Sequence, residues 1–309
     1  MKQHLHLLIL LLFALPVEAQ PTLESLLRAV DAAIEDSEQY EKDKMQRITL
    51  IKDGLKVSGL SLEEEYRINL RLYTEYEAYI CDSARHYINR NIELAVRLNN
   101  REWLNESKLK KVHILATSGL YAEGLRLLET INKQHLSDRL LVDYYMAFEN
   151  IYLYYAEYAQ DDEYMPGYLD KMNSYRDSVL MIVPEGSYQY VIVQGPMLIY
   201  HQQPKEAENL LKTYISGVSS DTREYAILTS ILAFTYQNDS QLELQKMCLA
   251  ESAIADIKAV VKENNSLRAL AELLYEEGAI ERANKYMKKS MAGNRSMSLI
   301  QDQHRSENL

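Results

Sequence analysis

Apolar residues recur along most of the chain three or four positions apart, which is the spacing of one helix face. The first such stripe consists of Leu23, Leu26, Leu27, Val30 and Ile34. Similar stripes occur in the segments 144–158 and 254–261. No sustained alternation of the kind that marks a strand interrupts them. Gly, Pro and Asn-Asp-Ser breaks separate the stripes at intervals that suit helix ends. The pattern predicts an all-α fold.

Two segments share a pattern that predicts paired helices. In the first, Gly119 is followed by Tyr121, then by the small residue Gly124, and then by apolar residues at helical spacing. The second begins at Gly278 and has Ala283 in the place of Gly124. The Gly turns the chain between two helices, and the small residue lets the second helix approach the first. Both segments therefore resemble tetratricopeptide repeats.

Weaker copies of the same pattern place Ala84, Ala207 and Gln245 in the small-residue position. The five small-residue positions lie 40, 83, 38 and 38 residues apart, and the interval of 83 leaves room for one further helical hairpin. Six helix pairs then account for residues 62 to 290. We expect them to stack as a tetratricopeptide-like helical-hairpin solenoid with a right-handed superhelix.

The spacing also divides the chain into parts. We predict a signal peptide at 1–19, an N-terminal helical hairpin at 20–58, a tetratricopeptide-like repeat domain at 59–292 and a polar, disordered tail at 293–309.

The predicted signal peptide has three recognisable features. Lys2 supplies a positive charge, the nine residues Leu7–Leu15 are all apolar, and Ala19 stands at the −1 position of a cleavage site. The apolar run is shorter than the roughly 20 residues that a membrane-spanning helix needs. An uncleaved, buried N-terminal helix is the alternative. We expect an exported chain with no membrane segment in its mature form.

Two cysteines, Cys81 and Cys248, lie 167 residues apart. They form either one long-range disulfide or two separate buried thiols. Distant segments rarely meet in an extended repeat fold, which favours separate thiols.

Charge and composition exclude several classes of protein. The chain carries 34 basic and 45 acidic residues, a net charge of −11, and its pI is near 5.2. Nonspecific binding to nucleic acid or to an anionic membrane needs a basic patch, so neither is expected. The hydrophobic fraction of 47% is too high for a disordered protein.

No known catalytic or metal-binding motif is present in the sequence. It contains no HExxH, CxxC, phosphate-binding Gly loop or GxSxG elbow. Helix capping after Ser61 explains the acidic run 63–65, and a solvated loop, or less favourably a calcium site, explains the run 161–163. We predict no catalytic residue, no metal and no cofactor. An all-α enzyme with a carboxylate pair is the least favoured alternative.

Tyrosine dominates the aromatic residues, with 24 Tyr against 3 Phe and one Trp. Most tyrosines are expected at helix–helix contacts, with their hydroxyls reaching the rim. Tyr145 and Tyr152 form a second stripe on the helix that carries Tyr144 and Tyr155. Either this helix is buried on two sides, or Tyr145 and Tyr152 line a concave groove that binds a peptide or a glycan.

Several segments together resemble one family of unknown function, the Gram-negative tetratricopeptide membrane regulators. They are the signal peptide, the segments 82–84, 119–121 and 175–178, and above all 251–257 with 261–264 and 270–271. In that family an exported repeat domain precedes one transmembrane helix, a cytoplasmic coiled coil and a regulatory output region. The resemblance runs from residue 1 to about 290, and the polar sequence after Ser290 departs from it.

The resemblance implies a periplasmic interaction domain that forms the sensory half of a truncated membrane-bound transcriptional or signalling regulator. Its partner would be a protein or peptide, or a small nutrient-derived ligand. This chain would itself bind no nucleic acid. A free-standing periplasmic scaffold or adaptor of an envelope complex is the alternative.

Overall fold

The computed structural model describes residues 21–159, 161–238 and 240–306, and the regular structure in these ranges is helical, without a strand. The predicted signal peptide and its cleavage site at Ala19 lie outside the described residues. The helices are α1 (Leu23–Glu35), α2 (Ser37–Asp53), α3 (Leu62–Tyr76), α4 (Cys81–Arg97), α5 (Arg101–Thr117), α6 (Tyr121–Glu129), α7 (Asp138–Ala159), α8 (Met165–Leu180), α9 (Tyr188–Tyr200), α10 (Pro204–Ile215), α11 (Arg223–Asn238), α12 (Leu242–Ala259), α13 (Asn265–Glu276) and α14 (Ile280–Ser306), with short 3₁₀ turns at Gly54–Lys56 and Lys133–His135.

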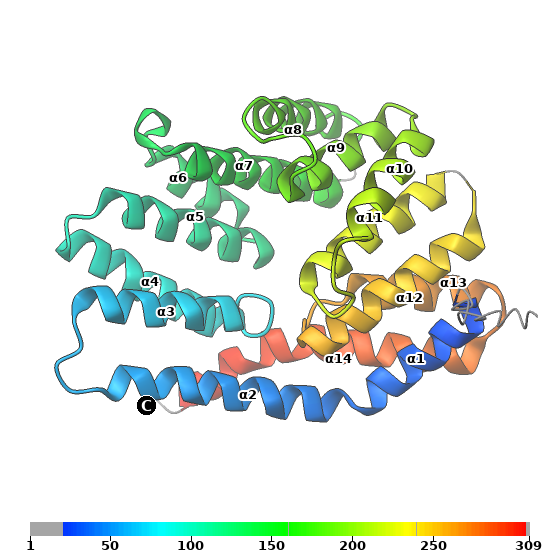
Figure 1. The fold of residues 1–309 in the computed structure, drawn as a ribbon, viewed down its shortest axis with the longest axis horizontal. Helices are drawn as coiled ribbons and strands as arrows, with labels where there is room; N and C mark the ends of the chain where they lie inside the picture. The colour runs from blue at the N-terminus through cyan, green and yellow to red at the C-terminus, as the bar shows by residue number, and fades with distance from the viewer. Residues whose placement is uncertain (1–20, 160, 239, 307–309) are drawn as a thin grey trace, which may run out of the picture.

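The helices from α3 to α14 pair consecutively into six hairpins, from α3–α4 to α13–α14. The hairpins follow one another around a ring, and α1 and α2 run along its lower edge (Figure 1). The predicted all-α, helical-hairpin fold is confirmed.

The turns inside four of the hairpins share one backbone geometry. Gly119 and Gly278 have φ angles of +76° and +85°, in the left-handed region that glycine adopts without steric cost. In the turn at Gly119, the Leu120 N–H donates to the Leu115 carbonyl over 2.8 Å, a bond that closes the end of α5. Gln202 and Ser240 hold the same left-handed position in the turns before α10 and α12.

The small-residue positions lie in the second helices of their hairpins. Ala84, Ala207 and Ala283 are buried in α4, α10 and α14. Gly124 of α6 packs so closely against α7 that an added Cβ would lie 3.0 Å from Cδ1 of Ile151. A larger side chain at any of these positions would push the two helices apart.

The predicted N-terminal helical hairpin is wrong. Helices α1 and α2 meet at Asp36 and extend roughly in line, so they span the ring instead of folding back on each other (Figure 1). Helix α1 packs against α12, where Leu27 and Val30 are buried, and α2 packs against α3 through Ile48. The amphipathic stripe was identified correctly, but its partner lies more than two hundred residues away in sequence. We call α1–α2 the strap.

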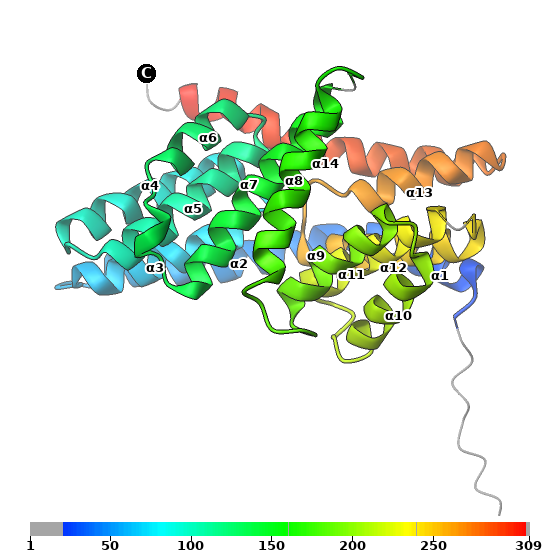
Figure 2. The ribbon, with the colours of Figure 1, turned by 90° about the horizontal axis from the view of Figure 1, so that it is seen from above.

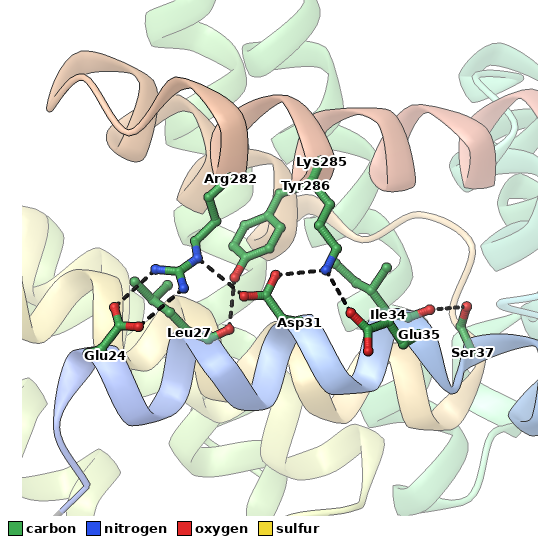
Figure 3. Close-up of polar contacts among 9 residues, drawn as sticks. All are labelled: Glu24, Leu27, Asp31, Ile34, Glu35, Ser37, Arg282, Lys285 and Tyr286. Atoms are coloured by element: carbon green, nitrogen blue, oxygen red, sulfur yellow. Dashed lines mark hydrogen bonds and ion pairs between the residues drawn. The ribbon is translucent and has the colours of Figure 1, made fainter.

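Charged and polar contacts join the strap to α14 (Figure 3). Arg282 pairs with Glu24 over 3.0 Å and with Asp31 over 3.3 Å. Lys285 pairs with Asp31 over 3.0 Å. Between these two cations, the fully buried Tyr286 donates its hydroxyl proton to the Leu27 carbonyl over 2.9 Å. The alternation of cation and carboxylate fixes α1 in one register along α14.

The segment predicted as a disordered tail, 293–309, continues α14 as far as Ser306. Its polar composition did not indicate this helix, but the segment contains no Pro that would end one. Figure 2 shows α14 along one edge of the molecule, beyond α13 and reaching α4 of the first hairpin.

Replacement of Gly124 by Leu should destabilise the protein by about 1–3 kcal/mol, because the new side chain would overpack the contact with Ile151. Urea unfolding measured by circular dichroism tests this. Gly167→Leu is the control, since no atom lies within 4 Å of a Cβ at that position. Equal stability of the two variants would contradict the close packing at Gly124.

Candidate functional site

Two adjoining cavities open inside the ring. The larger, of about 410 Å³, lies between the first helices of the hairpins, with walls from α3, α5, α7, α9 and α11. The smaller, of about 250 Å³, lies between α5, α11, α12 and the start of α13. Both are bordered by Glu77, His113, Arg223 and Ile227. They are therefore two lobes of one space, which we call the channel.

An ion pair stands where the two lobes meet. The Arg223 guanidinium of α11 lies 3.5 Å from the Glu77 carboxylate, which follows α3. Since α3 belongs to the first hairpin and α11 to the fifth, this pair crosses the ring. Both side chains keep part of their surface exposed to the channel, 41% for Arg223 and 23% for Glu77. An occupant can therefore reach either group.

The larger lobe combines an apolar floor with a charged rim. The floor is made by Leu109, Val112, Ala116, Met146 and Ile227. On the rim, the Lys110 ammonium lies over the ring of Tyr73, 5.2 Å from its centroid, and the Tyr73 hydroxyl donates to the Lys110 carbonyl. Glu106, Asp143 and Glu224 complete the rim with carboxylates. An apolar surface bordered by a few charges is the usual composition of a binding site.

The smaller lobe is polar. Ser252 and Ser266 form a hydrogen bond of 2.8 Å in its wall, and Tyr154 of α7 contributes an aromatic side chain. Burial raises the pKa of Asp256 to about 7, against a weaker opposing effect of Arg223. Burial also lowers the pKa of His113, so its imidazole is neutral at neutral pH. Asp256 and His113 can therefore form hydrogen bonds with an occupant of the lobe whether or not they are protonated.

One loop borders both the channel and α14. We call Val260–Asn264 the closing loop, because its Lys262 N–H donates to the Ala78 carbonyl over 2.9 Å and so joins the fifth hairpin to the first. Val260 has a φ of +58°, which is rare for a β-branched residue and stores strain. Val261 and Glu263 face the smaller lobe.

The other side of the closing loop packs on α14. The Ser290 hydroxyl donates to the Asn264 carbonyl over 3.1 Å. Gly293 lies so close to the loop that an added Cβ would overlap the Lys262 carbonyl oxygen. Only glycine allows this approach.

The structure places the two predicted groove residues outside the channel. Tyr145 and Tyr152 pack against Tyr175 of α8, with ring centroids 6.2 and 5.9 Å apart. Helix α7 instead lines the channel with Met146, Asn150 and Tyr154. The predicted repeat positions Ala84, Gly119, Tyr121, Gly124, Ala207, Gly278 and Ala283 lie at helix contacts and turns.

Sequence reasoning missed the polar residues that meet in the channel. Glu77, Arg223 and Asp256 come from three separate elements, and no motif links them. The one available signal was Asp256 itself, an acidic residue among the apolar positions of the segment 253–257.

The described residues hold no group of His, Cys, Asp and Glu side chains arranged to bind a metal. Both thiols are free, Cys248 buried and Cys81 half-buried at the edge of the smaller lobe. Within the described ranges, no helix has the length and apolar character needed to cross a bilayer.

A family model described as the SusR N-terminal TPR domain matches residues 34–298. The chain belongs to this family. The TPR domain is similar in structure to TTC0263, a thermophilic TPR protein of Thermus thermophilus, with 20% identity over 70% of this chain and 100% of that one and a TM-score of 0.48. It is also similar to a MamA RS-1 ArsTM double mutant, with 14% identity over 76% of this chain and 98% of that one and a TM-score of 0.31. Among curated proteins, no sequence matches it. As a TPR domain, the chain is a helical-repeat domain for interaction with proteins or peptides.

The contribution of Asp256 to the stability of the TPR domain should fall as the pH rises from about 4 to about 7. Asp256 has a pKa of about 7 in the folded state and an ordinary value of 3.8, so its contribution is full below the unfolded pKa and is lost as the pH passes the folded one. Asp256→Asn should therefore stabilise the protein at pH 8 by about 2–4 kcal/mol and leave it unchanged near pH 4.

Urea unfolding of both proteins across this pH range measures the difference. The exposed variant Asp162→Asn is the control and should match the parent protein throughout. A constant offset between Asp256→Asn and the parent at all pH values would show that Asp256 does not titrate as described.

Proposed function

We propose that this TPR domain is the periplasmic, sensory half of a membrane-bound regulator. Its channel binds a partner, and displacement of the closing loop by that partner changes the position of α14. The family description supports this, because it names the domain as the N-terminal TPR domain of SusR. The signal-like segment 1–19 supports export.

The observation that carries the proposal is the position of the closing loop. Glu263 faces the smaller lobe, while the adjacent Lys262 carbonyl lies against Gly293 of α14. The two contacts are one residue apart on the same backbone. Any occupant that displaces Glu263 therefore moves the surface on which α14 rests.

The contact with α14 suits transmission of a small movement. Gly293 brings the α14 backbone directly onto the loop, with no side chain between them to absorb a shift. Helix α14 continues beyond this contact to Ser306, so a tilt at Gly293 is carried along the rest of the helix. Helix α14 would then have two ways of packing against the closing loop, and binding of the occupant would favour one of them.

A binding role also agrees with the family, because TPR-repeat families are in general scaffolds for interaction.

Fractionation of cells that produce the native protein tests export and membrane attachment. We expect a polypeptide in the membrane fraction that is larger than this chain, with its TPR domain open to protease only from the periplasmic side. A soluble periplasmic species of about 34 kDa, the mass left after signal removal, would instead show a free-standing scaffold.

A bulky side chain introduced into the smaller lobe acts as a permanent occupant and tests the coupling between the channel and α14. Ser230→Trp places an indole in the smaller lobe, and we expect altered amide hydrogen exchange in the closing loop and in α14 up to Gly293. The matched control is Ser174→Trp on the exposed face of α8, which should leave both segments unchanged.

Addition of Gly293→Ala to Ser230→Trp should abolish the response in α14, because the overlap with Lys262 already displaces the helix. A folded Ser230→Trp protein with native exchange in α14 would falsify the coupling.

A further inference from the structure

Carboxylates outnumber cations around the channel. The six carboxylates are Glu77, Glu106, Asp143, Glu224, Asp256 and Glu263. Among the described lining residues, the cations facing them are Lys110 and Arg223. His113 adds no charge, because burial lowers its pKa.

The available cations are already engaged. Arg223 pairs with Glu77 over 3.5 Å, and Lys110 lies over the Tyr73 ring. At the outer rim, Arg139 reaches Glu106 over 3.2 Å and Asp143 over 3.8 Å. Even with Arg139 included, the channel keeps an excess of negative charge.

The ratio of carboxylates to cations among the described lining residues is higher in the smaller lobe than in the larger one. Arg223 is the single cation among the described residues that line it, and the same lining contains the carboxylates of Glu77, Asp256 and Glu263. The pKa of Asp256 is raised by burial, against a weaker opposing effect of Arg223. An added cation beside Asp256 would oppose the effect of burial and favour the charged carboxylate.

The channel also offers surfaces for the stems of long cationic side chains. Arg and Lys combine an apolar stem with a charged tip. The larger lobe provides an apolar floor, and Tyr154 provides an aromatic side chain beside the carboxylates of the smaller lobe. An Arg or Lys tip in the smaller lobe would lie near an aromatic ring and near carboxylates at once.

We propose that the channel binds an extended segment of a partner protein that carries Arg or Lys side chains, with a cationic tip between Asp256 and Glu263. This rests on the channel being the binding site of the proposed function. The two adjoining lobes suit an extended chain, because they offer successive places for side chains along one path. The net charge of −11 on the whole chain would speed the approach of such a partner.

Fluorescence anisotropy with a labelled peptide tests the proposal at pH 8, above the pKa of about 7 of Asp256, where that side chain is charged. The probe is an eight-residue Gly/Ser peptide with two arginines, and the control peptide carries uncharged citrulline in their place. We expect the arginine peptide to bind at least tenfold more tightly than the control. We also expect the binding to weaken as salt is added.

Variants locate the site. Asp256→Asn and Glu263→Gln should each weaken the arginine peptide about tenfold, and Ser230→Trp should block it. Glu206→Gln, on the exposed surface of α10, is the control and should bind as the parent protein does. Equal affinity of the parent and the Asp256 and Glu263 variants would place the cation elsewhere and overturn the proposal.

Small cations test whether the channel recognises a protein segment or any small cationic molecule. If free arginine or spermine binds as tightly as the peptide, the channel is a small-cation site and the proposed protein segment is wrong. If the arginine and citrulline peptides bind alike, the cationic class is wrong. In that case amide hydrogen exchange of the Ser230→Trp variant still decides whether the channel is coupled to α14, because that experiment uses no ligand.

Discussion

Closure of the ring is the constraint on which the rest of the structure depends. A stack of helical hairpins has two free ends, and here the strap and the closing loop join the last hairpins to the first. The strap buries Leu27 and Val30 against the C-terminal hairpins and Ile48 against the N-terminal one. Without this closure the lobes of the channel would have no common wall, since Glu77 and Arg223 come from opposite sides of the ring.

Apolar burial and charge have different roles in that closure. Burial of a Leu or Val side chain contributes about 1.5–3 kcal/mol, whereas a partly exposed ion pair contributes about 0–1 kcal/mol. The pairs of Arg282 and Lys285 with the strap are partly exposed. Apolar contacts therefore hold the strap in place, and the ion pairs determine its register along α14.

The sequence predicted what is local and periodic. The stripes of apolar residues gave the helices, and the small residues at Ala84, Gly124, Ala207 and Ala283 marked the second helix in four of the six hairpins. Turns with non-glycine residues, at Gln202 and Ser240, made the middle repeats hard to recognise, although their backbone is the same. Long-range contacts leave no such pattern. The strap was read as a hairpin because periodicity identifies a buried face but not its partner. The channel residues were missed, because spacing along one helix does not show which of two apolar faces lines the channel. A binding role for Tyr145 and Tyr152 stays a prediction.

The position of the strap also governs the order in which the protein can fold. Helix α1 is made before the helices on which it packs, α12 and α14. A chain that emerges from a ribosome must therefore carry the exposed stripe of α1 until the final hairpins arrive. Ordinary hairpin solenoids can complete their packing repeat by repeat. In this protein an early helix docks last. During the interval before its partner helices exist, a chaperone or another copy of the chain can bind the apolar stripe of α1 in place of the chain's own C-terminal half.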